Sequence, residues 1–185
     1  DDYRQQADET DSEDRKDEDL VQRGSHHFVI GSHCLLKRGG VFMKTVFMFS
    51  GQGAQYAGMG KELYQNYGVA KDIFDRADAV LGYSIKDICF QDEQKLGETE
   101  YAQPAILTMS IAAFKVLEEQ GIRADMTAGL SLGEYSAYVA SGAMDFEEAV
   151  ALVQKRGRFM TEAVPSGEGA MYAICLLYTS DAADE

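Results

Sequence analysis

The sequence predicts an α/β fold in which helices alternate with the strands of a parallel sheet. Two short runs, Lys44–Phe49 and Met126–Leu130, have the apolar and β-branched composition of buried strands. Between and after them, apolar residues recur at helical spacing. Strands that are separated by helices form a parallel sheet, which we expect to be covered on both faces. The 185 residues suit one domain of this kind.

Helical periodicity is clear in the part of the chain between the two strands. A helical run follows Gly60, and Val69–Leu81 carries apolar residues on one face of a helix. A longer helix with one apolar stripe runs to about Gln120, and Pro104 suits its first turn, where no backbone N–H is needed. We expect these apolar stripes to form the core.

The alternation continues after the second strand. Leu132–Ala140 is expected to form a helix, and Asp145 is expected to cap a further helix that extends to about Met160. Gly169–Ile174 has the composition of another strand.

The N-terminal part of the chain differs in character from its middle. Residues 1–19 hold ten acidic and three basic residues, and residues 1–42 show neither helical nor strand periodicity. We interpret 1–42 as a disordered acidic leader and Met43 as the start of the folded unit. One set of codons for 38–43 would place a ribosome-binding site before that methionine, which favours a leader that is not native coding sequence. The alternative is a genuine acidic tail that contacts partners.

The C-terminal residues Cys175–Glu185 resemble the in-frame translation of a transposase-type sequencing adapter. We therefore predict a partial domain over residues 43–174, followed by non-native sequence at 175–185.

Composition excludes several classes of protein. The net charge is −14, and no segment concentrates Lys and Arg as nucleic-acid binding requires. No apolar run is long enough to span a membrane, and the first residues lack the order of a secretion signal. The three cysteines are odd in number and lack metal-ligand spacing. A cytoplasmic protein without nucleic-acid or membrane partners is therefore expected.

A serine between two glycines is the strongest functional signal. Gly129-Leu130-Ser131-Leu132-Gly133 lies where a strand passes into a helix, which is typical of a nucleophile elbow. The sharp turn strains the serine backbone, and side chains two residues away would crowd it. Ser131 is the predicted nucleophile for acyl chemistry, and an ordinary strand–helix turn is the alternative.

A serine nucleophile needs a base and an oxyanion hole. The histidines His26, His27 and His33 all lie in the predicted leader, so none is a credible base. The glycine-rich loop after the first strand lacks the Lys-Ser/Thr ending of a phosphate loop. We predict instead that the amide of Gln52 and the backbone N–H of Leu132 donate to the oxyanion. Glycines that merely permit tight turns would explain the loop equally well.

Arg156 is the predicted binding residue for a substrate carboxylate. It lies on the helix after the elbow, with Gly157 leaving room beside it. Arginine can hold a carboxylate by two parallel hydrogen bonds, which lysine does less well. A solvated residue that compensates the helix dipole is the competing interpretation.

Four motifs together resemble those of malonyl-CoA:acyl carrier protein transacylases, in the same order and at similar separations, over about residues 43–174. The motifs are Phe49-Ser50-Gly51-Gln52-Gly53-Ala54-Gln55, Gln103-Pro104-Ala105, Gly129-Leu130-Ser131-Leu132-Gly133-Glu134-Tyr135-Ser136-Ala137 and Arg156-Gly157-Arg158-Phe159-Met160.

The resemblance implies an α/β-hydrolase-like large subdomain with a parallel sheet and a ferredoxin-like subdomain, of which Gly169–Ile174 would be the first strand. It implies a nucleophile at Ser131, oxyanion donors at Gln52 and the Leu132 backbone, and a malonyl-binding arginine at Arg156. The implied substrates are malonyl-CoA and the phosphopantetheine arm of acyl carrier protein, in fatty acid biosynthesis, with no metal or redox cofactor.

Two departures from the family pattern bear on activity. Leu130 stands where many members have histidine before the serine. The catalytic histidine of the family comes later than Ile174, so the resemblance implies that this chain is inactive by itself.

Three other functions stay open. A polyketide acyltransferase would share the motifs, although Leu132 after the serine favours malonyl over methylmalonyl. A serine hydrolase would share the elbow, although Arg156 and the Gln52 loop count against it. A non-catalytic interaction protein would depend on the acidic leader.

Overall fold

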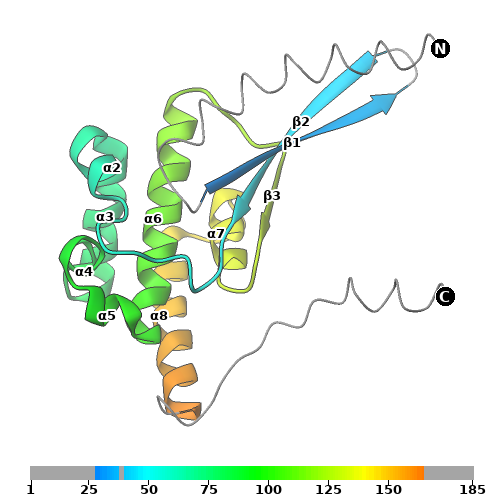
Figure 1. The fold of residues 1–185 in the computed structure, drawn as a ribbon. Coiled ribbons are helices and arrows are strands. Elements are labelled where there is room, and N and C mark those ends of the chain that lie inside the picture. The colour runs from blue at the N-terminus through cyan, green and yellow to red at the C-terminus, as the bar shows by residue number, and fades with distance from the viewer. Residues whose placement is uncertain (1–27, 38–39, 165–185) are drawn as a thin grey trace, which may run out of the picture.

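The computed structural model describes residues 28–37 and 40–164, which form a three-stranded sheet with helices packed against it (Figure 1). The predicted α/β class is confirmed. The elements in chain order are β1 (Phe28–Lys37), β2 (Gly40–Phe49), α2 (Lys61–Asn66), α3 (Gly68–Leu81), α4 (Ile85–Gln91), α5 (Glu93–Gly97), α6 (Thr99–Glu119), β3 (Met126–Gly129), α7 (Gly133–Ala140) and α8 (Phe146–Ala163).

β2 lies in the middle of the sheet, between β1 and β3. β2 and β3 run parallel, with Phe47 opposite Thr127 and Phe49 opposite Gly129. Because parallel strands end at the same edge of a sheet, the loop after β2 and the loop after β3 are neighbours. The Leu130 N–H joins them by donating to the Phe49 carbonyl at 3.1 Å.

The prediction that residues 1–42 lack structure is wrong for part of that segment. β1 pairs antiparallel with β2 along its whole length, and β2 itself begins at Gly40, ahead of Met43. The run Phe28-Val29-Ile30 suits a strand, and its pairing satisfies the backbone groups along one edge of β2. The acidic character of the first residues does not extend to this run. The rest of the predicted leader lies outside the described residues.

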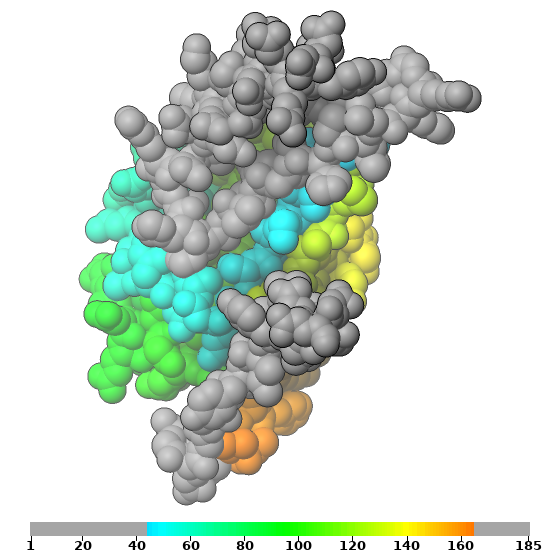
Figure 2. Space-filling model, turned by 45° about the vertical axis from the view of Figure 1, so that its right-hand side comes forward, coloured from blue at the N-terminus to red at the C-terminus, as the bar shows by residue number. Residues whose placement is uncertain are grey.

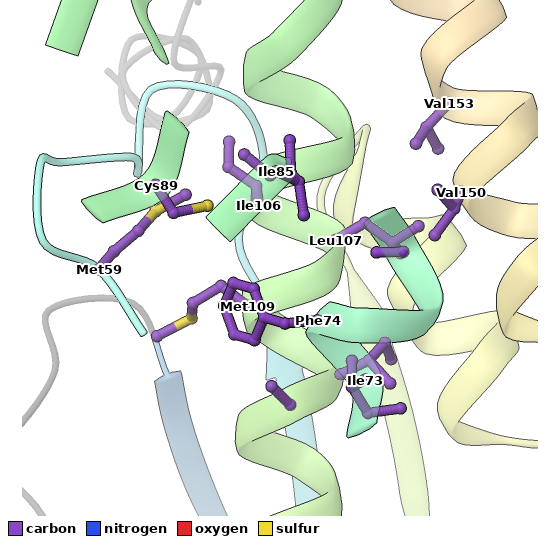
Figure 3. Packing of buried hydrophobic residues seen from close by; sticks show 14 of the residues in the cluster. Met59, Ile73, Phe74, Ile85, Cys89, Ile106, Leu107, Met109, Val150 and Val153 are labelled. Carbon is purple, nitrogen blue, oxygen red and sulfur yellow. The ribbon is translucent and has the colours of Figure 1, made fainter. Parts of the chain in front are cut away.

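The main core lies among the helices, with α6 at its centre. Leu107 of α6 points toward Val150 and Val153 of α8 (Figure 3), and all three are fully buried. Phe74 of α3 and Met109 of α6 both lie beside Gly60. Burying a side chain of this size stabilises the fold by about 1.5–3 kcal/mol relative to exposing it. The apolar face predicted for α3 is confirmed, with Ala70, Ile73, Phe74, Ala77 and Leu81 buried.

α6 starts earlier and is more completely buried than predicted. It begins at Thr99, so Pro104 lies inside the helix rather than in its first turn. Buried residues run without a gap from Ala102 to Ala112, rather than along one stripe. The reason is that α6 lies between the sheet and the other helices, so that nearly its whole circumference contacts protein.

The described helices cover one face of the sheet. Phe47 and Phe49 pack edge-to-face on Phe114 of α6, with ring centroids 5.8 and 6.5 Å apart. The opposite face carries Met48 and Met126, which are 47% and 50% exposed. Figure 2 shows β2 (cyan) and β3 (yellow-green) side by side at the surface. The prediction of two covered faces is therefore wrong for the described residues, because α6 and α7 pack on the same side.

The last two described helices follow the prediction closely. α7 begins at Gly133, and α8 continues to Ala163, past the predicted end at Met160. Asp145 is the N-cap residue of α8, although its side chain accepts no capping hydrogen bond. The strand predicted over Gly169–Ile174 lies outside the described residues.

Candidate active site

The turn between β3 and α7 has the geometry of a nucleophile elbow. Ser131 has a φ of 53°, the only positive φ at a non-glycine position in the described part of the chain. A Cβ on Gly129 would overlap the backbone of Gly133, and a Cβ on Gly133 would overlap the carbonyl of Phe49. Only glycine fits at either position, so the spacing seen in the sequence is a steric requirement of the turn.

Leu132 places a free backbone donor beside the serine. Its side chain is fully buried, which anchors the start of α7 in the core. Its N–H donates to no other group within residues 28–37 and 40–164. The group lies at the N-terminal, electropositive end of α7. It can therefore donate to a negative charge that develops next to Ser131.

Gln52 lies in the loop that runs beside the elbow. This loop is held close to the elbow, since a Cβ on Gly51 would be only 2.8 Å from the Leu130 carbonyl oxygen. The side-chain Nε2 of Gln52 donates to Thr99 Oγ1 at 3.0 Å. The backbone N–H of Gln52 has no acceptor among the described residues. The structure thus places Gln52 close to the Ser131 turn. Its side-chain amide is hydrogen-bonded to Thr99, the first residue of α6.

Arg156 extends from α8 to the serine. Its Nη2 donates to Ser131 Oγ at 3.1 Å, and its Nη1 donates to Gln103 Oε1 at 2.8 Å. The guanidinium also lies over the Tyr135 ring, 5.8 Å from the centroid. No carboxylate of the described residues lies within ion-pair distance of Arg156. A positive charge without a counter-ion among the described residues is thus held beside Ser131, where it can bind an anion.

Gln103 lies at the candidate site, although its position in the sequence predicts no role for it. It is fully buried on α6 and contacts Arg156, Gln52 and Met160. Its place in a motif was visible in the sequence, but its neighbours come from elements distant in the chain. One sequence signal pointed to Gln103. Helical periodicity places this amide side chain in the core, where a polar group needs hydrogen-bond partners.

Gly157 sets the distance between α8 and α6. A Cβ at this position would lie 2.8 Å from the Thr99 carbonyl oxygen and 2.9 Å from Glu100 Cα. Gly157 was predicted to leave room for the Arg156 side chain. The structure shows instead that it allows α8 to pack closely against α6. The close approach of the two helices carries Arg156 to Gln103.

We expect Gly157→Ala to destabilise the chain by about 1–3 kcal/mol, because the added methyl meets rigid backbone. Gly68→Ala is the matched control, since a Cβ on this glycine in α3 has no neighbour within 4 Å. Urea unfolding of the two variants measures the difference. Equal midpoints would show that α8 can shift without cost.

No described side chain is placed as a base for Ser131 by a hydrogen bond to its hydroxyl. The only side chain that the structure records in a hydrogen bond to Ser131 Oγ is Arg156, which donates but cannot accept a proton. His33 lies in β1 opposite Lys44, whereas the elbow lies at the Phe49 end of β2. Five residues of strand separate these positions, about 16 Å at the usual rise. His26 and His27 lie outside the described residues.

Other reactive groups do not compete with Ser131. Burial raises the pKa of the Cys89 thiol and raises the pKa of Tyr83 to about 12, so neither ionises near neutral pH. A surface hollow of about 700 Å³, lined in part by Tyr83 and Tyr101, contains none of the candidate residues. Within the described ranges, no cluster of His, Cys, Asp and Glu could hold a metal ion.

Among the helices that the structure describes, none combines the length and the apolar composition that a membrane-spanning helix needs.

Curated relatives and solved structures agree on the kind of protein that the chain resembles. It is 54% identical over 132 residues to a malonyl CoA-acyl carrier protein transacylase of Bacillus subtilis, and 47% identical over 130 residues to one of Escherichia coli. These matches cover 71% and 69% of the chain, and 42% of each relative. The chain thus spans less than half the length of these relatives.

Two solved structures extend the comparison to the fold. The crystal structure of MCAT from Streptococcus pneumoniae matches with a TM-score of 0.64 and 57% identity, over 65% of this chain and 39% of that one. A malonyl-transacylase in complex with a type II PKS acyl-carrier protein matches with a TM-score of 0.62 and 42% identity, over 65% of this chain and 40% of that one.

A family model of the acyl transferase domain matches residues 46–184, which include the elbow, the Gln52 loop and α8. The chain therefore belongs to the acyl transferase domain family.

Proposed function

We propose that the enzyme containing this chain moves a malonyl group from coenzyme A to the phosphopantetheine thiol of acyl carrier protein, through an ester on Ser131. The observation that carries this proposal is the guanidinium of Arg156, which has no carboxylate partner among the described residues and lies 3.1 Å from Ser131 Oγ. In a malonyl ester the carboxylate is one methylene group away from the acyl carbon, so it would lie close to this charge. An acetyl group offers no such partner.

In the proposed reaction, Ser131 Oγ attacks the thioester carbonyl carbon while its proton passes to a base. The carbonyl oxygen gains negative charge, which the Leu132 N–H stabilises as one donor. Gln52 supplies the second donor. Its side-chain Nε2 already donates to Thr99, whereas its backbone N–H has no acceptor among the described residues, which favours the backbone group.

The first half ends when the carbon–sulfur bond breaks and coenzyme A leaves as the thiol, taking up the proton held by the base. In the second half the thiol of the carrier protein loses its proton to the base and attacks the malonyl ester, the bond from the acyl carbon to Ser131 Oγ breaks, and Ser131 regains its proton. No described side chain accepts a hydrogen bond from Ser131 Oγ. The resemblance to the transacylases supports a histidine from a later part of the enzyme as the base. No metal or redox cofactor enters these steps.

The carrier-protein substrate is supported by the relatives, whose names include acyl carrier protein, and by the solved complex with a type II PKS carrier protein. We propose fatty acid biosynthesis in the cytoplasm as the setting. The solved complex also favours a second candidate, the loading of a polyketide carrier protein, which uses the same chemistry.

Transfer and hydrolysis are separated by the fate of the malonyl group. We expect a full-length enzyme containing this chain to malonylate carrier protein that bears its phosphopantetheine arm, and to leave carrier protein without the arm unmodified. Intact-mass measurement of the carrier protein, with free malonate quantified in parallel, checks this. Malonate release without any malonyl carrier protein would identify a hydrolase instead.

A further inference from the structure

The buried amide of Gln103 links the two halves of the candidate site. Its Oε1 accepts from Arg156 Nη1 at 2.8 Å, and its Nε2 faces Gln52 Oε1 at 3.4 Å and Met160 Sδ at 3.2 Å. The residue is fully buried, within a stretch of α6 in which every residue from Ala102 to Ala112 is buried. We propose that Gln103 is a positioning residue that fixes the guanidinium of Arg156 while leaving its charge available to the substrate. This inference rests on the proposed function.

The orientation of the amide follows from its neighbours. Arginine has only donors, so the atom that faces Arg156 Nη1 must be the amide oxygen. The amide nitrogen of Gln103 then faces Gln52, which must present its own oxygen in return. Gln52 Nε2 consequently turns toward Thr99 Oγ1, as observed. One buried amide therefore sets the orientation of both neighbouring side chains.

Gln103 accepts a hydrogen bond from Arg156 without carrying a charge of its own. A glutamate at this position would form a buried ion pair with Arg156 and would occupy the charge that the malonyl carboxylate needs. Glutamine holds the guanidinium by a hydrogen bond without neutralising it. The other contacts of Arg156 cannot replace it, because Ser131 is the reacting group and Tyr135 offers only a ring face. The fixed geometry thus depends on Gln103.

The test uses Gln103→Glu and Gln103→Met in a full-length enzyme containing this chain. We expect each variant to lower the ratio of malonyl to acetyl loading on Ser131 by about 10- to 100-fold, which is the effect of losing a hydrogen bond to a charged group. In the Met variant the loss comes from a guanidinium that is no longer held, and in the Glu variant from its neutralisation. The readout is kcat/KM for malonyl-CoA and for acetyl-CoA.

Thr108→Val is the matched control. Thr108 is also fully buried on α6, and its hydroxyl has no hydrogen-bond partner among the described residues. The variant keeps the side-chain shape and should leave the malonyl-to-acetyl ratio unchanged. The double variant Gln103→Met/Arg156→Ala should have the same malonyl-to-acetyl ratio as Arg156→Ala alone, because both substitutions act through one guanidinium.

Two results would overturn the inference. One is an unchanged ratio in both Gln103 variants. The other is failure of both variants to fold while Thr108→Val folds, which would assign Gln103 to stability alone. Failure of the proposed function is a separate result, because it would be seen as absence of malonyl loading on Ser131 in the unmodified enzyme.

Discussion

Replacing Ser131 by alanine is expected to abolish the covalent acyl-enzyme with malonyl-CoA and with acetyl-CoA alike. The hydroxyl is held at the tip of the elbow by a left-handed backbone, and the described residues offer no second nucleophile beside it. Removing the nucleophile of a serine enzyme lowers turnover by about 10⁶-fold in a well-studied case, and we expect a loss of at least about 10⁴-fold here. Intact-mass measurement of a full-length enzyme after mixing with each donor checks this.

Ser136→Ala provides the control for that experiment. Ser136 lies on α7 close to the elbow, is fully buried, and has a hydroxyl without a partner among the described residues. Its loss should leave acylation intact. A mass increase that persists in the Ser131 variant would show that another group carries the acyl chain.

Arg156→Ala is expected to penalise malonyl transfer far more than acetyl transfer. Only malonyl carries a charge for the guanidinium to pair with, and no described carboxylate competes for it. Losing a desolvated, charge-assisted pair typically costs about 2–5 kcal/mol, which corresponds to tens- to thousands-fold in discrimination. The measurement is kcat/KM for malonyl-CoA and acetyl-CoA in the full-length enzyme.

Two further substitutions sharpen the comparison. Arg158→Ala removes an exposed arginine from the same helix, one that faces Glu100 at 3.7 Å, and should leave the donor ratio unchanged. Arg156→Lys keeps the charge but loses the planar fork, so an intermediate ratio is expected. Equal losses for both donors in Arg156→Ala would remove this residue from substrate recognition.

Local sequence rules predicted the elbow correctly because a large part of its cause, the contact of Gly129 with Gly133, lies within one short segment. The turn needs glycine on both sides of Ser131 for steric reasons that act within a few residues and against the neighbouring strand. The strand before the elbow and the helices on either side of it were predicted for similar reasons, since periodicity reports which face is buried. The parallel pairing of β2 and β3 followed from the helices between them.

The errors arose where distant parts of the chain decide the outcome. Pairing with β2 turns residues 28–37 into a strand, although the acidic residues before them suggested a leader without structure. Packing on nearly all sides extends α6 through Pro104. Gln103 contacts Arg156 because Gly157 allows α8 to lie close to α6, which no spacing within one helix reveals. The roles assigned to Ser131, Gln52, Leu132 and Arg156 stay predictions, and so do the domain boundaries other than the predicted start of the folded unit at Met43.

The left-handed backbone of Ser131 also means that stability and chemistry impose opposite demands on this position. Glycine adopts a φ of 53° without the steric cost that a serine bears there, so the sequence that folds most easily is one without a nucleophile. Strain of this kind costs on the order of 1 kcal/mol or more, a noticeable part of the net stability of a small domain. Under the proposed function, the need for acyl chemistry keeps serine at this position, and a lineage released from that need would gain stability from a single change to glycine.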